Sequence, residues 1–162
     1  CEVGYQCPGW GRVEPEACQV GYVCDQPGLS IPEKPCPPGY YCETGTTTDD
    51  PQSLSGKPPL SCPSGLFCLR GVAHRDLSPS VGLPSFDMSF PQPCAEGYYC
   101  SSNSSIPLGD GPCFPGHYCP TSSRYPVQVP PGTFASDSGS IVPSLCLPGT
   151  FSPRPGSILC SP

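Results

Sequence analysis

One motif, Cys-x-x-Gly-Tyr-x-Cys, constrains the fold of this 162-residue chain more than any other feature. Six copies have five residues between their two cysteines and a glycine at the fourth position; they span residues 1–7, 18–24, 36–42, 62–68, 94–100 and 113–119. Two further copies are altered. Residues 129–135 lack both cysteines, and residues 146–152 have serine in place of the second. A unit that recurs in this way predicts a repeat array and excludes a domain with one continuous core.

The composition points to covalent support in place of a large apolar core. The chain has 19 glycines and 27 prolines, and only 36% of its residues are apolar. Ordering a backbone costs about 1–2 kcal/mol per residue, which so few apolar residues do not offset. The 14 cysteines are even in number and regularly spaced, whereas C-x5-C is not a zinc spacing and the only histidines are His74 and His117. We therefore expect disulfides, formed in an oxidising, extracellular compartment.

Two pairing schemes fit the spacing of the cysteines. In the first, each motif closes on itself, which gives Cys1–Cys7, Cys18–Cys24, Cys36–Cys42, Cys62–Cys68, Cys94–Cys100 and Cys113–Cys119, and leaves Cys146 to pair with Cys160. In the second, the second cysteine of each motif joins the first cysteine of the next. The first scheme is preferred because it uses every cysteine. Loop-closure entropy does not separate the two, so both remain open on the sequence.

Turn and strand signals alternate along the chain. Proline followed by glycine, as in Pro38-Gly39 and Pro148-Gly149, suits the two central positions of a type II turn. An aromatic residue usually follows two places after the glycine and ends a short extended segment. Short strands are therefore expected at Tyr40-Tyr41, Leu66-Phe67, Tyr98-Tyr99 and around Phe151. Prolines interrupt every candidate helix. The sequence predicts a small disulfide-rich repeat array that is elongated and mostly irregular, with short β-hairpins and almost no helix.

Spacers of different length divide the array. Residues 1–68 hold four tandem repeats with a long spacer at 43–61, 69–93 form an insert, 94–119 hold two repeats, 120–145 are a spacer with the cysteine-free copy, and 146–162 are the final repeat. The insert has more apolar residues than a solvated loop needs, so we expect another subunit or a distant repeat to cover them. A local fold-back is the alternative. The candidate assembly contacts are Leu83, Phe86, Met88 and Phe90, together with Trp10.

Several functional classes are disfavoured by the sequence. The net charge is −6 without a basic cluster, so nucleic acid is a poor partner, and no apolar run is long enough for a membrane span. The sequence His74-Arg75-Asp76 has no partner motif, and Asp110 does not lie in a calcium-binding loop. We predict no catalytic, metal or cofactor site. Asn103, the only asparagine, begins an Asn-Ser-Ser sequon and is expected to carry a glycan.

The motifs also resemble known modules. Residues 146–152 (Cys-Leu-Pro-Gly-Thr-Phe-Ser) followed by Cys160 resemble the ephrin-receptor-like cysteine-rich module, which is related in style to tumour-necrosis-factor-receptor repeats. The Cys-Pro-Pro-Gly-Tyr-Tyr-Cys form at 36–42 is similar to tandem repeats in large secreted proteins of algae and protists, including mastigoneme proteins of flagellar hairs. The resemblance covers nearly all of the chain.

Modules of this kind occur in receptors, matrix proteins and filaments. Serial disulfide units that each contact their neighbours suit assembly, so a structural role outside the cell or at its surface is expected. We expect a glycosylated segment of a filament or surface fibre that assembles with itself or with other fibre proteins. The alternative is the ligand-binding stalk or ectodomain of a cell-surface receptor.

Overall fold

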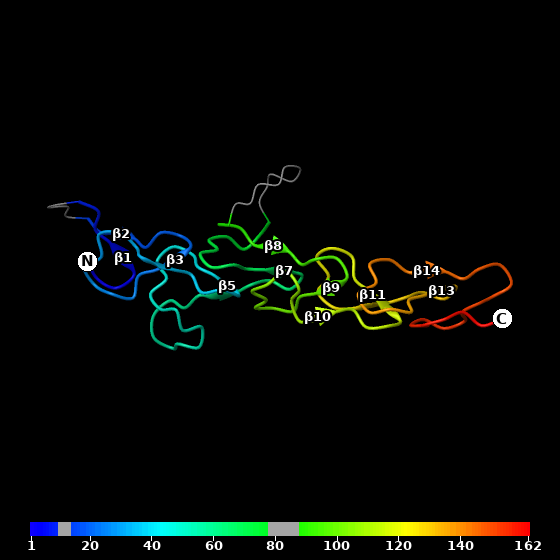
Figure 1. Cartoon of the computed structure of the whole chain (residues 1–162). Coiled ribbons are helices and arrows are strands. Elements are labelled where there is room, and N and C mark those ends of the chain that lie inside the picture. Colours follow the sequence, from blue (N-terminus) through cyan, green and yellow to red (C-terminus); the bar gives the residue numbers. More distant parts are fainter. Residues whose placement is uncertain (10–13, 78–87) are drawn as a thin grey trace. The chain divides into compact units, whose positions relative to one another are not determined.

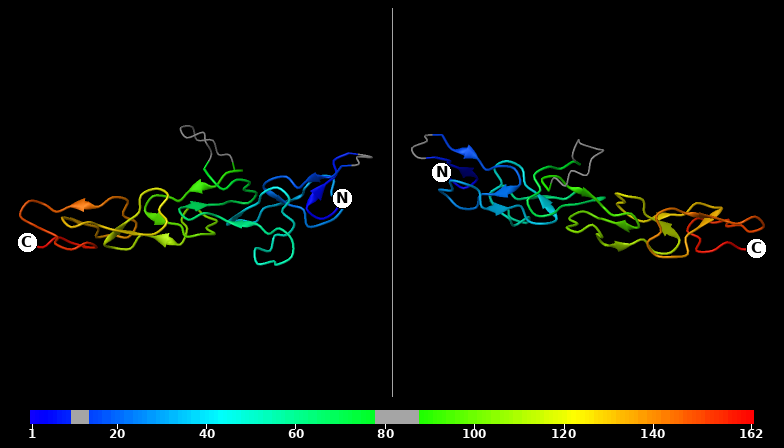
Figure 2. Two further views of the ribbon diagram at one scale, coloured as in Figure 1. Left: turned by 180° about the vertical axis from the view of Figure 1, so that it is seen from behind. Right: turned by 45° about the horizontal axis from the view of Figure 1, so that its top comes forward.

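The computed structural model describes residues 1–9, 14–77 and 88–162, and all of their regular structure consists of two-residue strands without a helix. The chain divides into two compact units, residues 1–63 with 68–92, and residues 64–67 with 93–162. Figures 1 and 2 show short arrows separated by long irregular segments. The prediction of a small disulfide-rich repeat array with short hairpins and almost no helix is confirmed. Accordingly, these three ranges contain no helix that could cross a membrane.

Each strand of a motif pairs with the two residues that precede the next motif (Figure 1). The seven two-stranded sheets are β1 (Tyr5–Gln6) with β2 (Glu16–Ala17), β3 (Tyr22–Val23) with β4 (Lys34–Pro35), β5 (Tyr40–Tyr41) with β6 (Leu60–Ser61), β7 (Leu66–Phe67) with β8 (Gln92–Pro93), β9 (Tyr98–Tyr99) with β10 (Gly111–Pro112), β11 (His117–Tyr118) with β12 (Val127–Gln128), and β13 (Thr133–Phe134) with β14 (Ser144–Leu145). Pairing is antiparallel, as where Tyr40 faces Ser61. Long spacers therefore connect short, closely paired ends.

The motif glycine forms the turn that leads into each strand. Its φ lies between +80° and +89° in all eight copies, in the left-handed region that favours glycine. In the copy at 36–42, the Tyr40 amide donates to the Pro37 carbonyl at 3.3 Å and closes the turn around Pro38-Gly39. This is the type II turn that the proline–glycine pairs predict.

The cysteines pair according to the first of the two schemes. Bonds join Cys1–Cys7, Cys18–Cys24, Cys36–Cys42, Cys62–Cys68, Cys94–Cys100, Cys113–Cys119 and Cys146–Cys160. The ten cysteines from Cys18 to Cys119 are fully buried. In one of the small cores, Val23 packs with Cys36 and Cys42 beneath Tyr40. The apolar interior is thus a series of small clusters built on the disulfides.

Candidate functional site: the contact between successive repeats

We number the repeats 1 to 8 in chain order, so that residues 129–135 are the motif of repeat 7 and residues 146–152 that of repeat 8. Two backbone hydrogen bonds connect each motif to the next. The motif glycine donates its amide to the carbonyl at the second-cysteine position of the following motif over 2.7–2.9 Å: Gly4 to Cys24, Gly21 to Cys42, Gly39 to Cys68, Gly65 to Cys100, Gly97 to Cys119, Gly116 to Ala135 and Gly132 to Ser152. The carbonyl of the same glycine accepts a hydrogen bond from the amide at the first-cysteine position of the following motif. The Cys36 amide, for example, donates to the Gly21 carbonyl at 2.8 Å. One glycine therefore joins two repeats through both its amide and its carbonyl.

A second set of hydrogen bonds comes from the spacers. After six of the motifs, the segment that follows the motif turns back and contacts the motif of the repeat before it. The residue at this turn, which we call the spacer-turn residue, donates its amide to the first position of that motif: Gly28 to Cys1, Gly45 to Cys18, Gly71 to Cys36, Ser122 to Cys94, Gly139 to Cys113 and Gly156 to Val129. The carbonyl of the residue after the spacer-turn residue accepts the amide at the second-cysteine position of the same motif. The Cys24 amide, for example, donates to the Thr46 carbonyl at 2.9 Å. The spacers are therefore structural parts of the array.

The spacer turn also approaches the motif two repeats before it. A Cβ atom placed on Gly21 would lie 2.6 Å from the carbonyl oxygen of Gly71, and one on Gly97 would lie 2.6 Å from that of Gly139. Such distances are too short for a real side chain. At these two positions glycine meets a packing requirement in addition to the positive φ.

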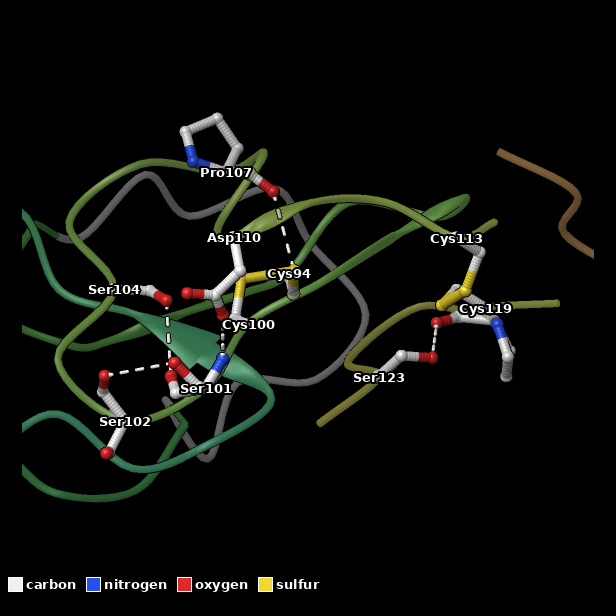
Figure 3. The surroundings of a disulfide bond; sticks show 11 residues. Cys94, Cys100, Ser101, Ser102, Ser104, Pro107, Asp110, Cys113, Cys119 and Ser123 are labelled. Atoms are coloured by element: carbon white, nitrogen blue, oxygen red, sulfur yellow. Dashed lines mark hydrogen bonds between the residues drawn. A yellow bond between two sulfur atoms is a disulfide. The ribbon is translucent and has the colours of Figure 1, made fainter. Parts of the chain in front are cut away.

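Two residues other than glycine stand at this place in the sequence: Ser122, which is three residues after Cys119 and makes the bond, and Asn103, which is three residues after Cys100. Asn103 and Ser122 have φ of 69° and 64°, and they are the non-glycine residues with positive φ among those described. Asparagine suits this region because its short polar side chain bonds locally. The loop that contains Asn103 is held by a bond from Ser104 Oγ to the Ser101 carbonyl at 3.2 Å and by one from the Ser101 amide to Asp110. Figure 3 draws both bonds. The Asn103 side chain is exposed, and its glycosylation stays a prediction.

Repeat 7 makes the same contacts without a disulfide. Val129 and Ala135 occupy the two cysteine positions with 0% and 3% exposure. Val129 donates its amide to the Gly116 carbonyl at 3.0 Å, and the Gly116 amide bonds to the Ala135 carbonyl at 2.8 Å. Ser152 takes the lost cysteine position in repeat 8 and is also buried.

The apolar contacts predicted for the insert 69–93 are only partly within the described residues. Leu83, Phe86 and Trp10 lie outside them, and Met88 is exposed. Phe90 stacks on His74 with ring centroids 4.3 Å apart and an interplanar angle of 16°. The Ala73 and His74 amides both bond to the Ser89 carbonyl, at 2.8 and 3.2 Å. The described ends of the insert thus close locally, and its use in assembly stays a prediction.

A small network of charges connects the spacers of the first unit. Lys34 Nζ lies 2.6 Å from Asp25 Oδ2 and 3.0 Å from Asp49 Oδ2. Hydrogen bonds to Asp25 and then Asp49 raise the pKa of Lys34, and the bond from Lys34 lowers the pKa of Asp49. Elsewhere in the unit, burial raises the pKa of Tyr41. Because Lys34 and Asp49 are 40% and 49% exposed, the network contributes only about 0–1 kcal/mol.

The sequence analysis did not identify the spacer-turn residues. The available signal was a glycine three or four residues after the second cysteine position, as in Gly28, Gly45 and Gly71. It is hidden because asparagine and serine replace glycine in two spacers, and because glycine is frequent in loops of any kind.

Together these contacts define a tandem cysteine-rich repeat array. Its disulfides indicate an oxidising environment, extracellular or secreted. The part of the chain that the structure describes has no group of three or more His, Cys, Asp or Glu residues that could hold a metal ion. Neither the models of known protein families nor the curated proteins include a match to this chain.

Proposed function

We propose that this chain is a structural segment of an extracellular, mastigoneme-like filament or surface fibre, which assembles with itself or with other fibre proteins. One observation carries the proposal. The contact between repeats uses the same backbone groups in each successive pair and needs no reactive side chain. Contacts between neighbouring units suit an array that grows by addition of identical parts, as in other repeat proteins.

The exposed sequon supports a glycoprotein. Asn103 lies on an ordered turn with its side chain exposed, a position open to a glycosyltransferase. Intact-mass measurement of the secreted chain before and after enzymatic removal of N-glycans tests this point. We expect a mass loss for the native chain and none for Asn103→Gln.

The receptor alternative can be tested at one exposed loop. Leu54, in the long spacer 43–61, is fully exposed. The spacer around it is ordered, because Lys57 donates its amide to Thr47 Oγ1 at 2.6 Å and its Nζ to the Thr44 carbonyl at 2.8 Å. Single exposed apolar residues are common on protein surfaces, so Leu54 does not mark a ligand site, but it offers a defined position at which ligand binding can be tested.

Immunogold electron microscopy separates the two functions. An antibody raised against the chain should label fibres on, or released from, the cells that express it, at regular intervals along each fibre. Label dispersed over the cell membrane without fibres would contradict the structural function. A Leu54→Ser variant that loses a soluble ligand would then support the receptor.

A further inference from the structure

A surface cavity lies in the segment that follows the motif of repeat 6. Its volume is about 250 Å³, and its lining includes Pro120, Thr121, Ser122, Arg124, Tyr125 and Val127. We call it the spacer cavity, and all of these residues belong to the second compact unit. Small-molecule sites usually have volumes of about 300–1,000 Å³, so the spacer cavity suits one ring of a longer ligand.

Four polar side chains of the spacer cavity have no hydrogen-bond or ion-pair partner in the described part of the chain: Thr121, Ser122, Arg124 and Tyr125. Thr121, Arg124 and Tyr125 are exposed, and Ser122 is half-buried. Three hydroxyl groups and one guanidinium are therefore free to bind a ligand at the same place.

The backbone of the spacer cavity is fixed by the contacts between repeats. The Ser122 amide donates to the Cys94 carbonyl at 3.0 Å, and the Ser123 carbonyl accepts the Cys100 amide at 2.9 Å. Ser123 Oγ closes the turn by donating to the Pro120 carbonyl at 2.6 Å. A ligand would therefore bind to a backbone that it does not have to order, which reduces the cost of binding.

The stem of Arg124 is held in place as well. A Cβ atom placed on Gly65 would lie 3.2 Å from Arg124 Cγ, so the stem lies against the motif glycine of repeat 4. Thr47 and Ala73 occupy the equivalent place over the motif glycines of repeats 1 and 2, and both are short and uncharged. An arginine with a packed stem and a free guanidinium loses less side-chain entropy when it binds an anion.

Ser122 adds a strained backbone to the spacer cavity. Its φ is 64°, whereas glycine stands at the other five spacer-turn positions that make the bond. Glycine would adopt this conformation without strain. The array thus has a hydroxyl group here at a conformational cost, as residues at binding sites often do.

Charge and an exposed aromatic ring indicate which ligand the spacer cavity suits. The chain has a net charge of −6, yet no aspartate or glutamate occurs between Asp110 and Asp137, so the Arg124 charge is not opposed by acidic neighbours in its own segment. Tyr125 is 68% exposed. The face of an aromatic ring carries partial negative charge and attracts polarised C–H groups, such as those of a sugar ring.

We propose that the spacer cavity binds one ring of a polysaccharide that bears carboxylate or sulfate groups. Arg124 pairs with the acid group, the Tyr125 ring packs on the C–H face of the sugar, and the Thr121 and Ser122 hydroxyls bond to sugar hydroxyls. An acidic peptide fits less well because few backbone groups are free: Pro120 has no amide, and the Ser122 amide is already bonded. The site goes beyond the proposed structural function and is compatible with a fibre or a receptor.

Titration of the full chain with three tetrasaccharides, followed by the shifts of its amide resonances in nuclear magnetic resonance spectra, tests the proposal. The probes are a galacturonic acid tetramer, a sulfated galactose tetramer and a neutral galactose tetramer. We expect the amides of residues 121–125 to shift with an acidic tetramer, and the neutral tetramer to bind about tenfold more weakly or less. The tighter of the two acidic tetramers identifies the acid group as carboxylate or sulfate.

Two variants test the side chains that carry the proposal. Arg124→Gln should weaken binding of the acidic tetramer about tenfold or more, because it removes the charge-assisted bonds. Tyr125→Ala should weaken it by about two- to tenfold. The matched control is Arg154→Gln, which removes an exposed arginine from the same unit outside the spacer cavity and should bind as the native chain does. Alkylation of the unreduced variants, with no cysteine labelled, shows that their disulfides are intact.

Each contrary outcome overturns the proposal without deciding the structural function. Equal weakening by Arg124→Gln and Arg154→Gln would mean that the tetramer responds only to net charge. A hexaglutamate peptide that binds more tightly than both acidic tetramers would assign the spacer cavity to a protein partner. The comparison with the neutral tetramer uses the native chain alone, so equal binding of all three tetramers excludes the site even where a variant does not fold.

Discussion

Repeats 6 and 7 are adjacent in the second unit and differ in one main respect. Repeat 6 is closed by Cys113–Cys119, and repeat 7 has Val129 and Ala135 at the same positions. The amide at the first position bonds to the preceding motif glycine at 2.9 Å in repeat 6 and 3.0 Å in repeat 7. The glycine bond to the second position is 2.8 Å in both. The backbone contacts and the glycine therefore define the repeat, and the disulfide is not needed for its conformation.

The disulfide acts mainly on the unfolded chain. A loop of seven residues is expected to contribute about 2.4 kcal/mol by limiting the unfolded ensemble. Repeat 7 has no such contribution of its own, but it lies between repeats 6 and 8, which are each closed by a disulfide. Its order then depends on its neighbours, as expected for an array stabilised by nearest-neighbour interfaces.

Reduction of all seven disulfides should have the largest effect on the order of repeats 6 and 7. We expect all repeats to lose their order, and repeat 7 to unfold with the rest although it has no disulfide to lose. Hydrogen exchange before and after reduction measures this. Protection of residues 129–135 that survives full reduction would contradict the dependence on neighbours.

Replacement of one disulfide should have a smaller effect. Cys113→Val with Cys119→Ala gives repeat 6 the residues of repeat 7 and should lower the free energy of unfolding by about 2–3 kcal/mol. The denaturation midpoint in guanidinium measures the change. Since the two backbone contacts stay in place, hydrogen exchange in native conditions should still protect the Gly97 amide. Loss of that protection would mean that the disulfide is required for the conformation.

Two alanine substitutions separate the backbone strain of the motif glycine from its close packing. Gly97→Ala adds a Cβ atom 2.6 Å from a carbonyl oxygen, whereas Gly132→Ala adds one to open space, and the two glycines have φ of 80° and 83°. Both variants bear the strain of the left-handed region, about 1–2 kcal/mol. Thermal unfolding should show a further loss of about 1–3 kcal/mol for Gly97→Ala alone. Equal losses would show that the spacer turn moves away freely.

The reverse change should produce the smallest effect. Val129→Cys with Ala135→Cys restores the missing pair and should form an eighth disulfide, since the backbone of repeat 7 matches that of its neighbours. We expect a gain of about 1–2 kcal/mol, because engineered disulfides often deliver less than the entropy of loop closure predicts. Mass spectrometry of the unreduced chain after alkylation shows whether the bond forms. Two labelled cysteines would mean that the two positions do not match the geometry of a disulfide.

Local signals predicted the motif and its strand. The turn at Pro38-Gly39 and the short strands at Tyr40–Tyr41 and Tyr98–Tyr99 follow from residue type and are present. The return strands were not predictable in this way. β10, Gly111–Pro112, consists of two residues that disfavour strands, and it pairs because the motif beside it supplies the bonding partner. A strand was also expected at Phe151, where the structure has only an isolated bridge to Ser161.

The contact between repeats could not be predicted from the sequence because it joins residues that are far apart in the chain. The approach of Gly97 to Gly139 crosses two motifs and the two spacers before them, and neither glycine differs locally from others in similar turns. Asn103 attracts attention as a sequon, yet its backbone conformation is that of a glycine. These relations depend on the register of the array, which the motif alone does not set.

Because the glycine contact is made by main-chain atoms, most side chains in the array can be substituted without loss of that contact. The spacers 25–35 and 43–61 and the insert 69–93 differ widely in length, yet the motif glycines beside them have the same backbone conformation. An array of this kind can gain loops, lose a disulfide as at Val129 and Ala135, or change its surface without a change of register. Recombination that adds or removes whole units would likewise preserve every junction, so the length of such a protein can change more readily than its local geometry.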